Sequence, residues 1–189
     1  ARGWADYKAG FGSLANAVTG AGDTNLWLGL AKMHEFTAAI PSKSWFHLYS
    51  RYDGTDTNWR YNHFKVEPES DKYRLRLSSA VTGSYGWDYH ADNQFNTKDS
   101  SSPSCSNSYN GGWWYGGCHY MNYNGLWGNG AVSTYANYAV DHAQHGYYYA
   151  ISNIDMMFKE TTTSEYDYTD AELWVDGTNY ATDAAGLQV

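Results

Sequence analysis

The chain has 189 residues, of which 18% are aromatic and 19 are glycine, and its formal net charge at pH 7 is −8. The length fits one domain, and the negative charge without a basic run argues against nucleic acids and anionic membranes, because both attract clustered Lys and Arg. The sequence contains no run of about 18 apolar residues, so no membrane-spanning helix is predicted.

Two short helices are predicted near the start of the chain. Trp4, Tyr7 and Phe11 recur at helical spacing, and Gly12 can end that helix. Asn25 can cap a second helix over the apolar residues that follow it. The many glycines favour turns and irregular loops over longer helices.

Strands are predicted next, because the period of the apolar residues changes to two. Runs at 44–51, 59–66 and 72–78, joined by turns, predict consecutive strands of an antiparallel sheet. Residues 83–104 lose this periodicity and predict a long ordered loop, whereas 147–160 fits a central strand.

The end of the chain has a different character. We place the main domain at 1–160 and interpret 161–189 as a C-terminal extension. The first part of this extension is polar and acidic, as in a linker. Two short β-prone runs on either side of Asp176 and Gly177 predict a small hairpin.

Both cysteines lie in the stretch 105–124, which also holds four glycines and three consecutive aromatic residues. These are Gly111, Gly112, Gly116, Gly117, Trp113, Trp114 and Tyr115. The glycines permit positive φ angles and close backbone approach, and the aromatics supply apolar area. A Cys105–Cys118 disulfide would close a loop of about 15 residues and stabilise it by roughly 3 kcal/mol. We therefore expect a constrained, aromatic-walled binding loop rather than a core element, in a secreted protein.

Several motifs resemble the fibrinogen-related domain, which occurs at the C-termini of fibrinogen subunits and in ficolins, tachylectins and angiopoietins. In the cysteine stretch they are Gly-x-Trp-Trp, Cys-His at 118–119 and Asn-x-Asn-Gly at 122–125. The segments 4–12, 27–37 and 67–75 also match the family. The resemblance implies an α+β fold with a central twisted antiparallel sheet, short helices and a large loop-rich binding subdomain.

Lectin-like members of this family accept an N-acetyl group in a pocket beside the disulfide loop. Carried over one position at a time, the pocket residues here are Tyr109, His119, Tyr135, Ala136 and Tyr147, with the backbone of Cys105. Such residues suit an acetamido group, because aromatic walls enclose the methyl, a backbone N–H donates to the carbonyl and a tyrosine hydroxyl accepts from the N–H. We expect non-covalent binding of N-acetylated carbohydrates or other acetylated ligands.

The resemblance also implies an unusual backbone at the first cysteine. The family has a cis peptide at the position of Ser104–Cys105, and away from proline a cis bond costs about 2.5–4 kcal/mol. Such a bond persists only where a binding pocket requires it. We therefore expect Ser104–Cys105 to be cis.

The loop before Cys105 resembles the family's approach to a calcium site. Asp99 stands there without the second acidic residue that the family places two positions later. A hard cation takes about six to eight oxygen ligands, with carboxylates foremost. Two interpretations stay open: a calcium site at Asp99, or a turn in which this carboxylate bonds nearby backbone N–H groups. His34 is expected to be a structural histidine.

Other functions are weaker candidates. The family's peptide-amine pocket needs an Asp where this protein has Ala136. Catalysis is not expected, because neither Asp99 nor Asp141 lies in a hydrolase motif, and His142 and His145 are more typical of a loop surface than of a metal site. The remaining alternative is an extracellular structural or protein-interaction module for assembly, adhesion or receptor binding.

Family members carry a further N-terminal subdomain, with its own disulfide, before the segment at Trp4. Either this protein is a trimmed domain or the tail hairpin supplies the missing strands. The sequence begins at Ala1 without a signal peptide, as a mature or trimmed secreted product would. The glycan type, the oligomeric state and the role in innate immune defence, adhesion or scaffolding are not determined by these motifs.

Overall fold

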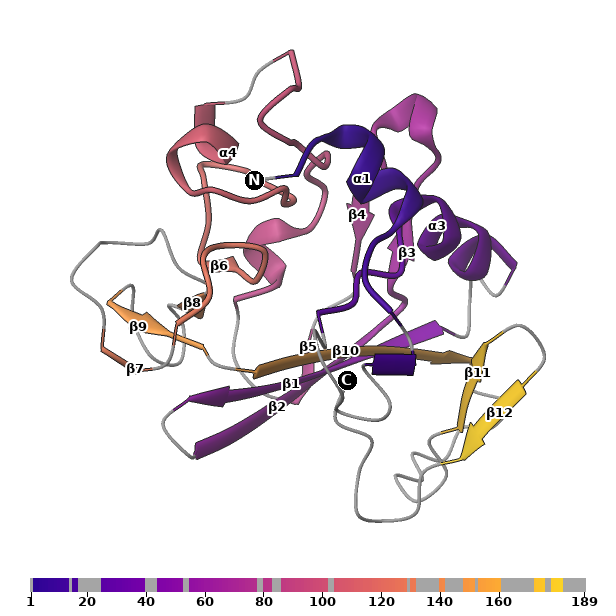
Figure 1. Cartoon of the computed structure of the whole chain (residues 1–189). Coiled ribbons are helices and arrows are strands. Elements are labelled where there is room, and N and C mark those ends of the chain that lie inside the picture. Colours follow the sequence, from indigo (N-terminus) through magenta and orange to yellow (C-terminus); the bar gives the residue numbers. More distant parts are fainter. Residues whose placement is uncertain are drawn as a thin grey trace.

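A computed structural model describes residues 2–13, 15–16, 25–39, 44–52, 55–77, 80–82, 86–101, 104–128, 130–131, 140–141, 148–151, 153–160, 172–175 and 178–181. These residues form an antiparallel sheet with short helices and long loops gathered on one side of it (Figure 1). The predicted α+β class is confirmed. None of the helices in these ranges has the length and apolar character needed to cross a membrane.

The first helix, α1 (Trp4–Ala9), ends where a glycine interrupts it. Gly10 has a φ of 93° and follows the last helical residue directly. Phe11 therefore lies outside the helix and pairs with Trp27 through two backbone hydrogen bonds of 2.9 and 3.0 Å. The predicted end at Gly12 is wrong, because Gly10 already adopts the positive φ that stops the helix.

The next helix, α3 (Leu30–Ala39), begins later than predicted. Trp27 belongs to the bridge with Phe11, and Gly29, with a φ of 100°, stands directly before the helix. Asn25 therefore does not cap it. The backbone pairing of Trp27 with Phe11 therefore replaces the helical conformation that the local pattern predicted at this position.

The main sheet has four strands in the order β10-β1-β2-β5. They are β1 (Ser44–Tyr52), β2 (Thr55–Asn62), β5 (Ala80–Thr82) and β10 (Asn153–Glu160). Every neighbouring pair is antiparallel, and the strand predicted over 44–51 is confirmed as β1. Among the described strands β10 lies at an edge, beside β1, so its predicted central position is wrong.

Two of the predicted strands are shorter or divided. The strand expected over 59–66 stops at Asn62, because His63 has a φ of 54°, which a strand does not allow. The strand expected over 72–78 keeps only two residues, because Lys72 and Tyr73 have φ angles of 49° and 50°.

Small two-stranded ladders surround the main sheet. They are β3 (Lys65–Val66) with β4 (Leu75–Arg76), β6 (Met121–Asn122) with β8 (Val140–Asp141), β7 (Gly130–Ala131) with β9 (Tyr149–Ala150), and β11 (Glu172–Val175) with β12 (Thr178–Ala181). The last ladder is the predicted tail hairpin. Among the described strands β11 and β12 pair only with each other, so the hairpin does not supply strands to the main sheet. The boundary near residue 160 stays a prediction.

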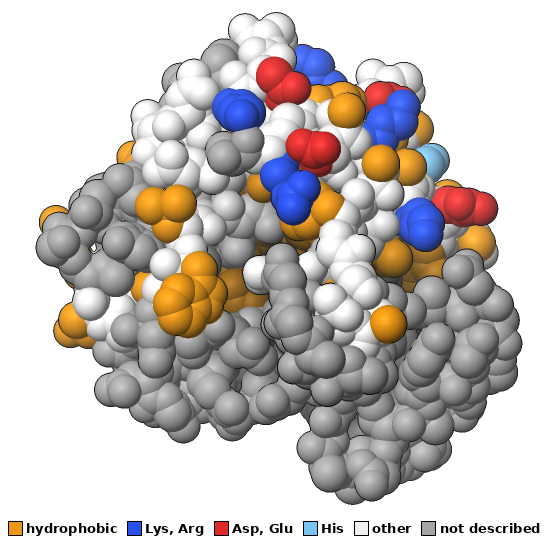
Figure 2. All heavy atoms as spheres, viewed as in Figure 1, with side chains coloured by type: hydrophobic (Ala, Val, Ile, Leu, Met, Phe, Trp, Pro, Cys, Tyr) orange, Lys and Arg blue, Asp and Glu red, His pale blue; other side chains and the backbone are white. Residues whose placement is uncertain are grey.

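The core is largely aromatic. Trp114 packs against Trp87 in a tilted arrangement, with ring centroids 6.1 Å apart, and against Phe95 edge to face, with centroids 5.1 Å apart. Such geometry is favourable for aromatic pairs. On the face shown in Figure 2, acidic and basic side chains are interspersed rather than gathered by sign. This face therefore offers no basic patch of the kind that nucleic acids need.

Candidate functional site: the disulfide-closed loop

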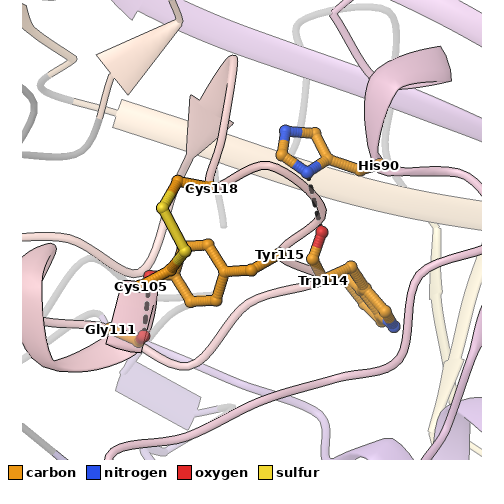
Figure 3. Close-up of a disulfide and its surroundings, with 6 residues drawn as sticks. All are labelled: His90, Cys105, Gly111, Trp114, Tyr115 and Cys118. Carbon is orange, nitrogen blue, oxygen red and sulfur yellow. Dashed lines mark hydrogen bonds between the residues drawn. A yellow bond between two sulfur atoms is a disulfide. The ribbon is translucent and has the colours of Figure 1, made fainter. Parts of the chain in front are cut away.

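The predicted disulfide is present and closes the loop. Cys105 and Cys118 are bonded, and their Cα atoms lie 5.3 Å apart (Figure 3). Cys105 belongs to the short helix α4 (Ser104–Ser108), which starts the loop. Cys118 has a φ of 73°, which turns the backbone back towards that helix. The two ends of the loop are therefore held together covalently.

The three consecutive aromatic residues of the loop lie in the core. Trp113, Trp114 and Tyr115 are only 0%, 1% and 7% exposed. The Tyr115 hydroxyl donates to the carbonyl oxygen of Gly111 at 2.8 Å, and Trp114 Nε1 donates to that of Tyr73 at 2.8 Å. The expectation that these rings wall a pocket is wrong, because their large apolar surfaces are more stable when buried.

Gly111 and Gly112 allow close approach rather than a positive φ. A Cβ at Gly111 would collide with the carbonyl oxygen of Asn124, and one at Gly112 would lie 2.6 Å from the Tyr7 ring. The Gly112 N–H donates to the Tyr7 hydroxyl at 3.0 Å. None of the four loop glycines has a positive φ, so of the two possibilities that glycine permits, the loop uses close backbone approach.

The Asn-x-Asn-Gly motif folds back onto the loop. Asn122 Nδ2 donates to the carbonyl oxygen of Tyr109 at 2.9 Å. Asn124 Nδ2 donates to that of Gly112, also at 2.9 Å. The two amides thus satisfy loop carbonyls that neither a helix nor a sheet would pair.

His90, at the end of the 3-10 helix η2 (Asp88–His90), joins the loop to the segment that follows it. Its Nδ1 lies 2.8 Å from the carbonyl oxygen of Trp114 (Figure 3), and its Nε2 accepts the N–H groups of Tyr120 and Met121 at 3.3 and 3.1 Å. Because Nε2 accepts, the ring proton is on Nδ1, which donates to Trp114. Burial lowers the pKa of His90 to about 3, so the ring is neutral. A single histidine in a loop has no sequence signal for this role.

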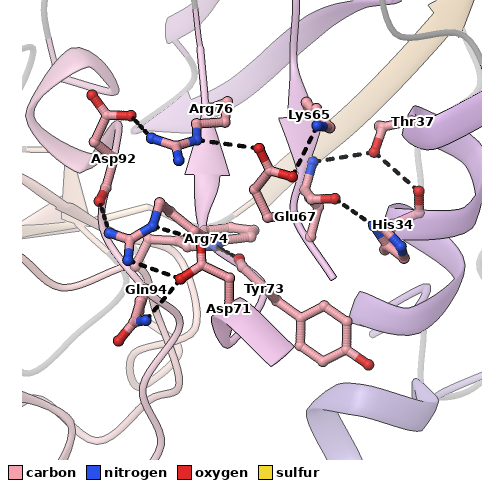
Figure 4. Close-up of polar contacts among 12 residues, drawn as sticks. His34, Thr37, Lys65, Glu67, Asp71, Tyr73, Arg74, Arg76, Asp92 and Gln94 are labelled. Atoms are coloured by element: carbon pink, nitrogen blue, oxygen red, sulfur yellow. Dashed lines mark hydrogen bonds and ion pairs between the residues drawn. The ribbon is translucent and has the colours of Figure 1, made fainter. Parts of the chain in front are cut away.

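Ion pairs brace the segment around His90 (Figure 4). Arg74 binds Asp71 through two hydrogen bonds of 2.8 and 2.9 Å and also donates to the backbone carbonyl of Asp92. Arg76 joins the Asp92 carboxylate to Glu67. The hydrogen bond from Arg74 is the main cause that lowers the pKa of Asp71, in the 3-10 helix η1 (Glu69–Asp71), to about 2.

His34 and Thr37 hold α3 against β3 (Figure 4). The Val66 N–H donates to Thr37 Oγ1 at 3.1 Å, and His34 Nδ1 lies 2.8 Å from the Val66 carbonyl oxygen. This contact agrees with the expectation that His34 is structural.

Three of the predicted pocket residues meet beside the disulfide. The rings of Tyr109 and His119 are perpendicular, with centroids 4.5 Å apart, and His119 is only 5% exposed. Tyr109 follows α4, and its N–H donates to the carbonyl oxygen of Cys105 at 2.9 Å. Their roles in binding stay a prediction. The other predicted pocket residues, Tyr135, Ala136 and Tyr147, lie outside the described residues.

The Ser104–Cys105 peptide bond is trans, since the described backbone contains no cis bond. The predicted cis bond is therefore wrong. Both residues belong to α4, and helical hydrogen bonding requires trans peptides. The N–H of Cys105 lies in the first turn, where backbone N–H groups lack an acceptor within the helix.

Asp99 is engaged with the N-terminal helix. Its two carboxylate oxygens lie 2.9 and 3.0 Å from the backbone nitrogen of Trp4, and the Thr97 hydroxyl donates to one of them at 2.5 Å. These bonds, that of Thr97 foremost, lower the pKa of Asp99. In the part of the protein that the structure describes, no three His, Cys, Asp or Glu side chains are grouped to hold a metal ion. The residues at Asp99 therefore do not fit a calcium site.

Asp99→Ala should lower the free energy of unfolding by about 1 kcal/mol, because it removes the acceptor of the Trp4 N–H at the start of α1. Thermal melts should show a midpoint about 2–4 °C lower, whether calcium or a chelator is present. Asp88→Ala is the matched control, because none of the hydrogen bonds seen among the described residues joins Asp88 to α1. A rise of several degrees in the wild-type midpoint on adding calcium, absent from the variant, would contradict this assignment.

Comparison with known sequences places the protein in a family. Residues 1–161 match the model described as the C-terminal globular domain of fibrinogen beta and gamma chains. Angiopoietin-related protein 6 of Mus musculus is 36% identical over 134 residues, which are 67% of this chain and 27% of that protein. Ryncolin-4 of Cerberus rynchops is 32% identical over 173 residues, which are 86% of this chain and 48% of that protein. The sequence thus spans less than half of either relative.

Solved structures agree with this assignment. The fibrinogen-like globe domain of human ANGPTL6 has a TM-score of 0.72 at 26% identity, covering 86% of this chain and 72% of that one. Lamprey fibrin D-dimer, solved with the peptide ligand Gly-His-Arg-Pro-amide, has a TM-score of 0.76 at 24% identity, covering 88% and 59%. The second likeness concerns the fold alone.

The fold and the disulfide-closed loop define a recognition or protein-interaction module. The chain belongs to the family of fibrinogen C-terminal globular domains.

Proposed function

We propose that this domain binds N-acetylated carbohydrates, or other acetylated ligands, non-covalently beside the disulfide. The observation that carries this proposal is the Tyr109–His119 pair, whose ring centroids lie 4.5 Å apart next to Cys118. The pair is held by a disulfide, by Asn122 and by the buried aromatic run. A rigid, partly apolar site with few polar groups suits a small ligand.

Each proposed contact has a chemical role. The Cys105 N–H in the first turn of α4 donates to the acetyl carbonyl, and Tyr109 and His119 line one side of the methyl group. The match to the family's pocket residues, rather than any described contact, is the basis on which we also assign Tyr135, Ala136 and Tyr147 to this site. A single shallow pocket binds weakly, so useful avidity needs several domains in one assembly. We also propose that the protein is secreted, because a structural disulfide persists in oxidising surroundings.

Protein binding without sugar recognition is the second candidate. Trp127 is 74% exposed, and Leu126, Tyr148 and Tyr149 are also exposed, in or near the β7–β9 ladder. Aromatic residues of this kind are frequent in protein interfaces. Free N-acetylglucosamine should compete with the ligand of a lectin and leave a protein-binding module unaffected.

Retention on immobilised N-acetylglucosamine tests the acetyl pocket. We expect elution by the free acetylated sugar but not by glucose, with or without chelator. Tyr135→Ala and His119→Ala should each weaken binding by at least about tenfold, since each removes a ligand contact. Phe36→Ala, an exposed aromatic on α3, is the control and should bind as the wild type does. Folded, disulfide-bonded wild-type protein that is not retained would refute the acetyl pocket.

A further inference from the structure

A second aromatic pair, Tyr89 in η2 and Tyr120 just after the disulfide-closed loop, is exposed. The rings of Tyr89 and Tyr120 have centroids 4.5 Å apart and an angle of 67° between them. Tyr89 is 36% exposed and Tyr120 is 39% exposed. Because the rings are inclined to each other, their faces form two flat surfaces at an angle rather than a single plane. This contrasts with the aromatic run of the loop, which is buried.

Glycine at 117 is what leaves room for this arrangement. A Cβ there would lie 2.7 Å from the Tyr89 hydroxyl oxygen, so a side chain at this position would force that hydroxyl to shift. Gly117 is itself exposed, and so is Gly116, which lies beside the amide group of Asn93. The glycine pair therefore forms a bare stretch of backbone between Tyr89 and Asn93.

Polar groups at this surface remain available to a ligand. Asn93 Nδ2 donates to the backbone carbonyl oxygens of Tyr89 and Ala91, at 3.1 and 3.2 Å. The Oδ1 atom of the same side chain can therefore accept a hydrogen bond from a ligand. The Tyr89 hydroxyl makes no hydrogen bond with the residues that the structure describes, and it can both donate and accept. None of these groups is charged.

The surface is also preorganised. Tyr89 directly precedes His90, whose Nε2 accepts the backbone N–H of Tyr120. The same ring donates to Trp114 in the core. Tyr89 and Tyr120 are thus joined through one buried histidine, so a ligand does not have to order them on binding.

We propose that Tyr89 and Tyr120, with Gly117 and Asn93, form a second carbohydrate subsite. It takes a neighbouring sugar of a glycan whose N-acetyl group occupies the pocket at His119, and it therefore rests on the proposed function. Tyrosine rings offer flat apolar faces to a sugar, and their hydroxyls bond to sugar hydroxyls. His119 and Tyr120 are consecutive, with Cα atoms about 3.8 Å apart, so the two aromatic pairs start from neighbouring backbone positions, and the proposal requires one glycan to contact both. The uncharged groups favour a neutral sugar over a charged peptide.

Titration with N-acetylglucosamine and with its 1,4-linked trimer tests this subsite. In the wild type the trimer should bind about tenfold more tightly than the monomer. Tyr89→Ala should reduce this ratio to nearly one, and Gly117→Ala should lower it by less, because the added methyl shifts the Tyr89 hydroxyl without removing the ring. Tyr89→Phe keeps the ring and should retain most of the ratio. Phe36→Ala is the exposed-aromatic control and should leave it unchanged.

The outcomes separate the subsite from the acetyl pocket. Equal affinity for monomer and trimer, or a ratio that survives both Tyr89→Ala and Gly117→Ala, overturns the subsite while the pocket stands. Trimer binding that depends on Tyr89, without any monomer binding, supports the subsite and counts against the pocket. Failure of the folded wild type to bind either sugar overturns both.

Discussion

Lowering the pH below about 6.5 should destabilise the folded domain through His90. Burial holds the pKa of His90 at about 3 in the folded state, whereas the unfolded protein has the ordinary value of 6.5. Between these two values the unfolded state binds a proton that the folded state does not. The free energy of unfolding therefore falls by about 1.4 kcal/mol for each pH unit of acidification. This stability is fully present above pH 6.5 and is lost towards pH 3.

Denaturant unfolding at a series of pH values between 7 and 4 measures this slope. His90→Gln is the informative variant, because it removes the titrating ring but keeps an amide that can donate or accept. The variant should be less stable at pH 7 and should lose less stability on acidification than the wild type. Identical slopes for the two proteins would show that His90 is not responsible. Protonation of Asp71 also lowers the free energy of unfolding on acidification, but only below its ordinary pKa of 3.8.

Removal of the disulfide should have the second large effect. Cys105→Ser with Cys118→Ser frees a loop of about 15 residues, which should lower the free energy of unfolding by roughly 3 kcal/mol. The corresponding fall in melting temperature is about 6–12 °C. Below that temperature the fold should survive, because the aromatic run between the cysteines is buried independently of the bond.

Thermal melts with and without a reducing agent check this result. The wild type should melt lower when reduced, and the double serine variant should melt at the same temperature under both conditions. Tyr109 and His119 lie next to the ends of the loop, so binding to immobilised N-acetylglucosamine should weaken even where the variant is folded. A wild-type melting temperature that does not respond to complete reduction would contradict the proposed role of the disulfide.

Local patterns in the sequence determined the features that depend on near neighbours and on chemistry. The alternating residues from Ser44 predicted β1, because side-chain period two is a property of the strand itself. The turn at Asp176 and Gly177 predicted the tail hairpin for the same reason. The two cysteines had only one way to pair within the protein. The family was likewise recognisable, because its motifs are short and contiguous.

Tertiary structure decided the features that depend on which face of a segment meets the rest of the protein. Spacing did not show that Trp113 and Trp114 lie in the core, because a run of aromatics suits a pocket wall and a core equally well. Neither did it show that Asp99 accepts from Trp4, 95 positions earlier, or that His90 joins Trp114 to Tyr120. These contacts follow from packing between distant segments, where burial and unpaired backbone groups select among alternatives that are equivalent locally.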